Sequence, residues 1–519
     1  MSLFLIGLIP IVLFLIMLAV FKLSPTISAY TSLGVAVLLS LIVKEWRMPV
    51  GGILGSIAEG FAVAWMPIGI VVIAAIFAYE LSVKTGEINV IKKMLGNITN
   101  DRRAQALLLA WGFGGFIEGV AGYGTAVAIP AAIMVSLGFT PMRAAIICLI
   151  ANTTPTAFGT VGLPVTTISS MMNLDPKNVS FFITLLLFVI MTMIPVVLTH
   201  LANGERKEGS KPFDGGIIPV IIASIIAYST QLVIAKVAGA ELPTIISSLL
   251  AMVFMIIAIK IFIKDENSEK DPVGAIEALR AWSPYILMVI LIVGTSPVVA
   301  GIHEMLAETT VTKIDFSFGH ADWFKVPGAQ TFKWILAPGV PIIIATVIAG
   351  YFQRSNAKDM LEVFKKTVKG KMGSITVIMG IVALSTVMKH SGMIASIATG
   401  LVALMGTKFP LISPLLGTIG TFVTGSDLSS NLLFGELQGN VAEGIKHGYT
   451  PLKELFVASN TAGATGGKMI SPQNIAIAAS TVGLIGKEGE MLRTTLKYAL
   501  VYATILGILV FIGSIVLQK

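Results

Sequence analysis

The sequence predicts an all-α polytopic membrane protein with two inverted-topology repeats, discontinuous helices and re-entrant hairpins. Three observations lead to this fold class. Hydrophobic residues make up 55% of the 519 residues and charged residues only 12%, against about 25% charged in soluble domains. Several apolar runs are long enough to cross a bilayer, which takes about 20 helical residues. The two halves of the chain also repeat short motifs in the same order.

The apolar runs predict membrane-spanning helices. They cover 3–22, 178–200, 217–235, 243–263, 284–300, 334–351 and 495–517. The alternation of a transmembrane β-barrel does not recur, so helices are the remaining way to satisfy the backbone inside lipid. We interpret 1–29 as a retained first helix, because it lacks the basic start and the small-residue cleavage site of a signal peptide.

Composition and missing motifs exclude several function classes. The net charge of +8 comes from basic residues scattered over loops, which indicates membrane orientation and not nucleic-acid binding. The single cysteine, Cys148, allows no intramolecular disulfide. Hydrolase, metalloprotease, dinucleotide and P-loop signatures are absent, so we expect neither an enzyme nor an ATP-driven pump. No cofactor or metal is expected, and energy must come from an ion or substrate gradient.

An internal repeat organises the chain. KTGEI at 84–88 resembles HSGMI at 390–394, and IEGVAGYGT at 117–125 resembles VTGSDLSSN at 423–431. The aligned glycines lie 306 residues apart in both pairs. We therefore divide the chain into a first helix, a first repeat, connecting helices with an extracytoplasmic loop, and a second repeat. These units are 1–29, 30–200 (broken helix 105–137, hairpin 143–168), 201–334 and 335–519 (broken helix 411–445, hairpin 451–480).

Loop charges predict that the repeats are inverted. The stretch 354–371 carries six basic residues, whereas its counterpart 48–65 carries none. One helix later the bias reverses, with four basic residues in 91–104 and one in 397–410. Cytoplasmic loops collect Lys and Arg, so equivalent loops face opposite sides. Inverted repeats are typical of secondary transporters whose substrate site lies near the membrane midplane.

Two glycine-rich segments predict broken helices. The stretch 112–125 contains Glu118, and 418–431 contains Asp427 with several hydroxyl residues. Irregular backbone at membrane depth is tolerated only beside protein or a watery cavity. An ionisable residue there is costly to bury, so we expect either carboxylate to carry a coupling proton. The alternatives are close packing of small residues and, for the acids, structural pairing with Lys468 or Arg143.

Two further segments predict hairpins with polar tips. ANTTPTAFGTVGLP begins at 151, and SNTAGATGGKMISP begins at 459. Their tips would present Asn152, Thr153, Asn460 and Thr461 as oxygen ligands for a monovalent cation. Lys468 is the best placed cation for a substrate carboxylate. The alternatives are caps on kinked helices and a lysine that snorkels from a helix end.

These segments resemble the bacterial L-lactate permease family, through FIEGVAGYGTAVAIPAAIMVSLGFTP at 116–141 and the blocks at 149–164, 424–438 and 458–490. The resemblance runs from about residue 3 to the C-terminus. It implies a bacterial plasma-membrane permease that imports L-lactate, D-lactate and glycolate by proton symport. The other substrate-binding candidates lie in the same blocks. They are Tyr123, Thr154, Ser429, Asn431, Ser471 and Gln473.

The Asn-Thr tips also resemble the Ser-Asn-Thr tips of the wider ion transporter superfamily. That likeness implies an elevator with scaffold and transport domains, working as a homodimer. Ala151 replaces the first serine, which favours H⁺ over Na⁺ as the coupling ion. A sodium-coupled carrier of another carboxylate and a passive anion channel stay open as alternatives. The sequence leaves open the preferred 2-hydroxy acid, the stoichiometry and which carboxylate carries the proton.

Overall fold

The computed structural model describes residues 2–21, 23–122, 124–206, 210–263, 273–295, 299–326 and 328–518. Within these ranges the secondary structure is helical apart from one β-hairpin. Among the described residues, nine helices are long and apolar enough to cross a membrane, or ten if the bent pair at 141–172 counts as one span. The prediction of an all-α polytopic protein is confirmed.

In the N-terminal part of the chain, 3-10 and π-helical segments interrupt the α-helices. Its elements are α1 (Ser2–Ala19), α2 (Pro25–Ile42), η1 (Lys44–Trp46), α3 (Val50–Val63), η2 (Ala64–Gly69), α4 (Ile70–Lys84), α5 (Glu87–Gly96), α6 (Arg102–Ala106), η3 (Leu107–Phe113), α7 (Gly114–Val120), α8 (Thr125–Ser136), α9 (Pro141–Ala151), η4 (Thr154–Phe158), α10 (Gly159–Met172) and α11 (Pro176–Asn203). The segments η2 and η3 are π-helical, a form often found at functional sites.

The remaining elements include the longest helices. They are α12 (Ile217–Ser229), α13 (Gln231–Ala238), α14 (Pro243–Phe262), α15 (Ala275–Thr295), α16 (Ala300–Thr310), β1 (Val311–Asp315), η5 (Ala321–Trp323), β2 (Ala329–Lys333), α17 (Gly339–Phe352), α18 (Ala357–Ser391), α19 (Met393–Met405), η6 (Gly406–Leu411), α20 (Ser413–Thr424), α21 (Asp427–Ser430), η7 (Asn431–Gly435), α22 (Glu436–Ile445), α23 (Thr450–Lys468), α24 (Pro472–Thr481) and α25 (Glu488–Gln518).

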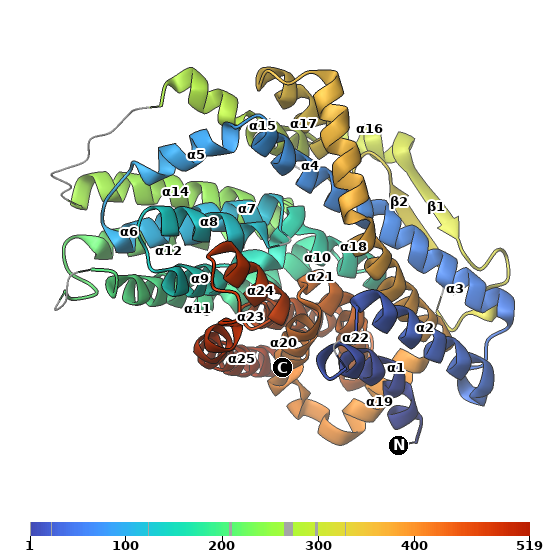
Figure 1. Ribbon diagram of the computed structural model, residues 1–519. Coiled ribbons are helices and arrows are strands. Elements are labelled where there is room, and N and C mark those ends of the chain that lie inside the picture. Colours follow the sequence, from blue (N-terminus) through green and yellow to red (C-terminus); the bar gives the residue numbers. More distant parts are fainter. Residues whose placement is uncertain are drawn as a thin grey trace.

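Two groups of helices flank a central region (Figure 1). The helices α11, α12 and α14 form one flank, and α2, α3 and α18 form the other, together with the β-hairpin. The broken helices and hairpins predicted from the sequence meet near the centre, where α10 and α21 lie. The inverted relation of the repeats, the unit boundaries and the elevator domains stay predictions.

Small residues bring α20 and α23 into close contact. A Cβ added to Gly463 would lie 1.9 Å from the Pro414 carbonyl oxygen, and one added to Gly417 would lie 2.1 Å from that of Asn460. Only glycine allows backbones to approach so closely. Several glycines of the predicted second tip therefore serve helix packing, the alternative considered above for the other glycine-rich segments.

This packing corrects the prediction for the second hairpin. Asn460 and Thr461 lie inside the continuous helix α23, not at a tip. The chain turns only at 469–471, before Pro472 begins α24. Glycine lowers helix propensity by about 1 kcal/mol per residue, but tight packing against α20 overrides that preference here.

The β-hairpin covers one end of α3 and α18. Its strands pair antiparallel, with Val311 opposite Lys333 and Asp315 opposite Ala329. Glu59 accepts hydrogen bonds at 2.9 Å from Gln330 and at 2.7 Å from His390, and both Glu59 and His390 are buried. This polar contact fixes the predicted extracytoplasmic segment to the helices.

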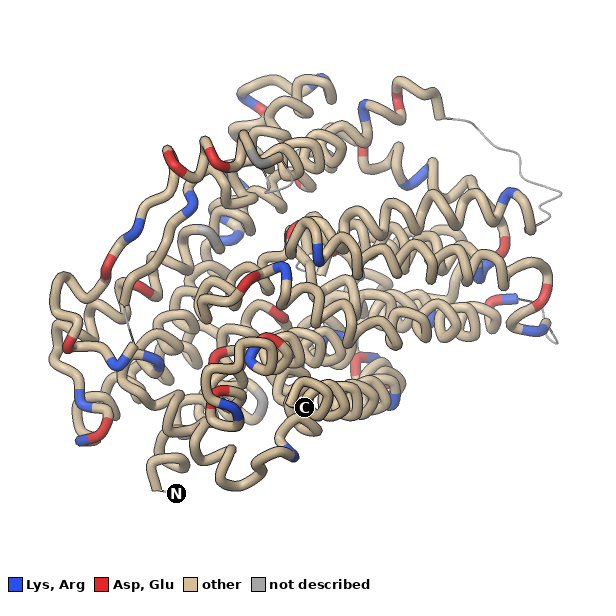
Figure 2. Tube along the Cα trace, turned by 180° about the vertical axis from the view of Figure 1, so that it is seen from behind, with Lys and Arg blue, Asp and Glu red and all other residues tan. Residues whose placement is uncertain are grey.

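Charged residues gather mainly at the ends of the helices (Figure 2). One such cluster is centred on Arg103, which pairs with Asp101 at 2.6 Å and with Asp214 at 2.8 Å. Burial raises the pKa of Asp101, but the hydrogen bonds and positive charge of Arg103 together lower it by more. The pKa of Asp101 therefore lies below its ordinary value. The cluster ties the start of α6 to the loop before α12.

Candidate functional site

The first broken helix ends beside Glu118. Helix α7 stops at Val120, and α8 begins at Thr125. The connection turns through Gly122 (φ 58°) and Gly124 (φ 84°), a left-handed conformation that glycine adopts without steric cost. A side chain at Gly122 would collide with Thr160 Oγ1, 2.4 Å from the position of a Cβ. The break therefore brings the last turn of α7 against the hairpin α9–α10.

The segment predicted as the first hairpin, 143–168, contains a strained turn. The chain bends by 49° between Pro141–Ala151 and Thr154–Met172, and Thr160, Val161 and Gly162 have φ values of 48°, 56° and 70°. Such values are rare for β-branched residues, and backbone strain of this kind clusters at ligand sites. A Cβ on Gly162 would lie 2.2 Å from the Ala240 carbonyl oxygen, so the turn is held tightly against the preceding loop of α14.

The second broken helix presents Asp427. Helix α20 ends at Thr424, and Gly425 follows in the left-handed conformation (φ 75°). Ser426 then caps α21 by accepting a hydrogen bond from the Ser429 amide at 3.3 Å. Asp427 thus occupies the first turn of the short helix α21.

Lys468 joins the two halves of the chain. It is the last residue of α23, it is 5% exposed, and its Nζ lies 2.5 Å from Glu118 Oε1. Charge-assisted hydrogen bonds of this length are among the strong ones in proteins. The candidate proton carrier Glu118 and the candidate substrate cation Lys468 are therefore direct partners, as one of the sequence alternatives anticipated.

A cavity of about 150 Å³ opens at this pair. Five predicted residues line it, namely Glu118, Asp427, Ser429, Lys468 and Gln473. Asp427 is within electrostatic reach of both Glu118 and Lys468. Both oxygens of Asp427 and the second oxygen of Glu118 are buried without a hydrogen-bond partner among the described residues. Unpartnered buried carboxylate oxygens are rare, and they mark this cavity as a site for a ligand or a proton.

Other predicted residues do not line this cavity but form a hydrogen-bond network between the elements around it. Asn431 donates to the Pro164 carbonyl at 3.1 Å and accepts from Asn460 at 2.8 Å and from Thr461 at 3.1 Å. Gln438 extends this network by donating to Asn460 at 2.7 Å. These side chains use their hydrogen-bonding capacity on each other, so their role in the structure is to join α23, η7 and the first hairpin.

The predicted first tip contains buried polar atoms without hydrogen-bond partners among the described residues. Thr153 donates to the Ile150 carbonyl at 2.8 Å. Asn152, by contrast, has both amide atoms buried without a partner in the described chain, and the Thr154 and Ser471 hydroxyls are in the same situation. None of these four is among the described residues that line the cavity. Tyr123, the remaining candidate, lies outside the described residues. Arg143 pairs with Glu205 at 3.0 Å, away from the cavity.

Several lining residues were missed by the sequence analysis. Thr156, Thr160 and Ser426 contribute hydroxyls, and each lies inside a motif already singled out, so their proximity to the chosen residues was the available signal. Helix α18 contributes Val377 and Ile378. Nothing in the uncharged part of that helix, 374–388, distinguishes these two positions from their neighbours, because only tertiary packing brings them to the cavity.

Comparisons with known proteins agree over nearly the full length. The model of a protein family described as L-lactate permease matches residues 3–517. An L-lactate permease of Streptococcus iniae is 40% identical, over 85% of this chain and 90% of that protein. Glycolate permease GlcA of Escherichia coli K12 is 31% identical, over 99% of this chain and 96% of that protein. The solved structure of Neisseria gonorrhoeae MtrF, described as illuminating a class of antimetabolite efflux pumps, shares the fold with a TM-score of 0.51, 12% identity and 96% coverage of both chains.

Proposed function

The chain belongs to the L-lactate permease family, and on that premise we propose that it carries L-lactate across the membrane together with a proton. As a permease it is a transporter and not an enzyme. Bacterial relatives and the many apolar helices identify it as a multi-pass bacterial membrane protein. D-lactate and glycolate are proposed as further substrates, since a glycolate permease is among the relatives.

The observation that carries the proposal is the Lys468–Glu118 pair beside the unpartnered Asp427. With all three groups ionised, the site holds a net charge of −1, and an uncompensated buried charge is costly. One proton on Asp427 makes the site neutral. A lactate anion restores a net charge of −1, so a second proton must enter with it. Neutrality alone thus favours one proton per lactate.

We infer that lactate and Glu118 compete for the same ammonium group. In the structure Lys468 bonds to Glu118. When the substrate carboxylate takes that place, Glu118 loses its partner and accepts the proton. The proton and the anion then cross together and leave together, because release of either one alone would leave an uncompensated charge buried in the site. Asp427 keeps its proton throughout the cycle.

The cavity suits a small 2-hydroxy acid. Its volume of about 150 Å³ equals that of an engineered protein cavity that binds benzene, a molecule with as many non-hydrogen atoms as lactate. The hydroxyls of Thr156, Thr160 and Ser426 would bond the polar end of the substrate. Val377 and Ile378 would contact the methyl group, which glycolate lacks.

We further propose that the two halves are inverted repeats within an elevator that works as a homodimer. Support comes from matched interruptions, since α7 and α20 both end in a glycine turn followed by a new helix. The hairpins α9–α10 and α23–α24 follow at corresponding places in the two halves. The cavity lies between α18 and these elements, so a sliding motion along α18 would expose it to alternate sides.

One observation favours sodium as the coupling ion instead. Asn152 Oδ1, Thr154 Oγ1 and Ser471 Oγ are buried oxygens without partners in the described chain. Carbonyl and hydroxyl oxygens of this kind are suitable ligands for a hard cation. If they bound Na⁺, the ion would neutralise the incoming anion and no proton would be needed.

Uptake of labelled L-lactate into proteoliposomes separates these functions. A pH gradient and a sodium gradient are imposed separately, with Glu118→Gln and Asp427→Asn alongside the native protein. Accumulation that follows the pH gradient, disappears in Glu118→Gln and persists in Asp427→Asn supports proton symport through Glu118. Accumulation driven by sodium alone would refute it, and flux that follows neither gradient would indicate a passive channel.

A further inference from the structure

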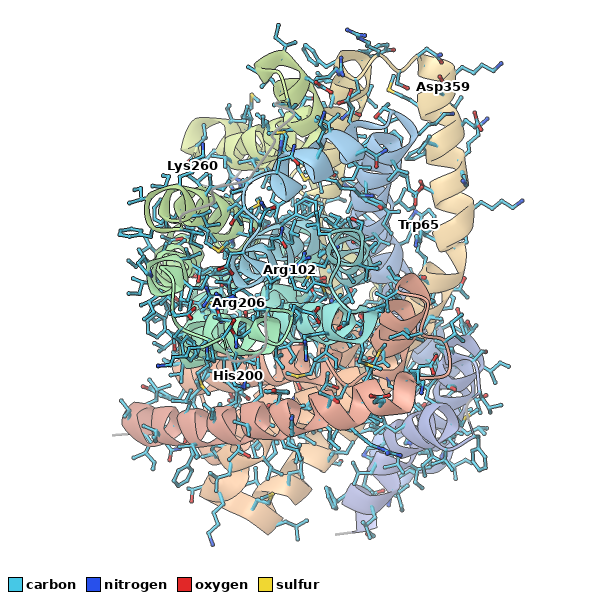
Figure 3. The ribbon with its side chains drawn as sticks, turned by 60° about the vertical axis from the view of Figure 1, so that its left-hand side comes forward. Trp65, Arg102, His200, Arg206, Lys260 and Asp359 are labelled. Carbon is cyan, nitrogen blue, oxygen red and sulfur yellow. The ribbon has the colours of Figure 1, made fainter. Side chains whose placement is uncertain are left out.

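A second cavity, of about 370 Å³, lies at the ends of three candidate spans. Lys84 ends α4, Arg280 lies in the second turn of α15, and Asp359 lies in the first turn of α18. Figure 3 shows Asp359 at the tip of that helix. Every residue that lines this cavity is polar, and none of them belongs to the site described above. The ends of membrane spans lie at the depth of lipid headgroups.

Three cations and two carboxylates line this second cavity. Lys84 bonds Asp359 at 3.1 Å and also Glu362, which does not line the cavity, at 3.0 Å, and Arg280 bonds Glu87. Arg354 lines the same cavity and has no carboxylate partner in the described chain. An anionic group that enters the cavity can therefore pair with Arg354.

Two buried atoms of this cavity lack hydrogen-bond partners among the described residues. Gln353 is 4% exposed, and its Oε1 accepts from Thr85 Oγ1 at 3.0 Å, but its Nε2 is unpartnered. Glu87 Oε2 is also unpartnered. The first atom needs an acceptor and the second needs a donor. A complementary ligand thus carries both anionic oxygens and a hydroxyl.

The backbone at Arg354 is unusual. Its φ is 61°, in the left-handed region. It ends α17 in a Schellman arrangement, in which the Arg354 amide bonds the Tyr351 carbonyl and the Ser355 amide bonds the Gly350 carbonyl. Glycine is the usual residue at this position. Arginine therefore occupies this position at a cost in backbone strain that glycine would not have.

Exposed apolar residues neighbour the lining residues of the second cavity in the chain. Leu279 and Phe352, each 63% exposed, directly precede the lining residues Arg280 and Gln353, and Leu361 (52% exposed) lies two residues after Asp359 on α18. Exposed apolar side chains near the ends of membrane spans are available for contact with acyl chains. Five lysines between 358 and 371 would attract an anionic lipid to this end of α18.

We propose that this second cavity binds the headgroup of phosphatidylglycerol. The phosphate oxygens accept hydrogen bonds from Gln353 Nε2 and Arg354, and a glycerol hydroxyl donates to Glu87 Oε2. The acyl chains lie along Leu279 and Phe352. A bound lipid would join α4, α15 and α18 at one membrane surface.

Native mass spectrometry of the full-length protein in detergent tests this site. Phosphatidylglycerol and phosphatidylethanolamine are titrated onto the native chain, onto Arg354→Gly and onto Lys358→Ala. We expect the native chain to bind one phosphatidylglycerol molecule tightly. Arg354→Gly should bind it about tenfold more weakly, which is the loss expected when one hydrogen bond to a charged group is removed. The melting temperature of Arg354→Gly should not fall, because glycine relieves the backbone strain. Lys358→Ala removes one charge from the same basic end of α18 but does not line the cavity, so it should lose much less affinity than Arg354→Gly does.

Three outcomes would overturn the assignment. Equal affinity for phosphatidylethanolamine would mean that the cavity does not distinguish an anionic headgroup from a zwitterionic one. Equal losses in Arg354→Gly and Lys358→Ala would indicate general attraction to the basic surface. Displacement of the lipid by inorganic phosphate at similar concentration would mean that the cavity holds a soluble anion and not a lipid.

Discussion

Replacing Glu118 by glutamine should tighten lactate binding and remove its pH dependence. Glu118 accepts a hydrogen bond from Lys468 at 2.5 Å. In the native protein the substrate carboxylate must displace Glu118 from this contact. A hydrogen bond between charged groups contributes about 1.5–3 kcal/mol. Glutamine offers only a neutral oxygen, so the dissociation constant for lactate should fall by roughly 10- to 100-fold where Glu118 is otherwise ionised.

The pH dependence gives a second readout of the same substitution. If one proton enters with each lactate, native binding weakens by about tenfold per pH unit once Glu118 is ionised in the empty site. In Glu118→Gln no proton is needed, and the dissociation constant should become flat with pH. Lactate exchange between the two sides should persist, whereas accumulation driven by a pH gradient should be lost.

Calorimetric titration of the purified protein with L-lactate over a series of pH values measures both effects. Glu454→Gln is the matched control, since Glu454 is a buried carboxylate on α23 that bonds Asn178 and does not line the cavity. It should leave affinity and slope unchanged. A native slope in Glu118→Gln, or weaker lactate binding than in the native protein, would show that lactate and Glu118 do not compete for Lys468.

Three further predictions follow from single contacts. Ile378→Ala should raise the KM for L-lactate about fourfold, the cost of roughly 0.8 kcal/mol for one unburied methyl group, and should leave glycolate uptake unchanged in the same transport assay. Gly463→Ala should destabilise the protein by about 1–3 kcal/mol or more, because its Cβ would meet backbone at 1.9 Å, whereas Gly489→Ala, which meets nothing within 4 Å, should not lower the melting temperature in detergent. Arg103→Gln should lower the melting temperature at neutral pH, and this deficit should shrink as the pH falls through the lowered pKa of Asp101. The reason is that an acid whose pKa is lowered in the folded state stabilises the fold only at pH values above that pKa. A deficit that stays constant in acid would contradict this prediction.

The charged residues of the cavity were predictable because lipid makes them costly. A carboxylate or ammonium within an apolar run stands out in the sequence, and Glu118, Asp427 and Lys468 were chosen on that ground. The same argument predicts no geometry. That Lys468 contacts Glu118, while Asp427 has no partner in the described chain, follows from how α7, α21 and α23 pack.

Polar residues were harder to assign from the sequence. Asn460 and Thr461 match a tip motif, yet they lie in a continuous helix and bond Asn431. Motifs rich in glycine and Asn-Thr are compatible with a break and with close packing alike. The choice depends on whether another backbone lies against the glycines, as α20 does here.

The sequence by itself determined the class of this protein, its family and the ionisable residues worth attention, because hydrophobic length and buried charge act residue by residue. Only the tertiary structure decided which of those residues face one cavity. It also brought Ile378, in the uncharged stretch 374–388 of α18, to that cavity, and Arg354 to a second one. The physical reason is that contacts between residues hundreds of positions apart depend on the packing of whole helices, and no local pattern records that packing.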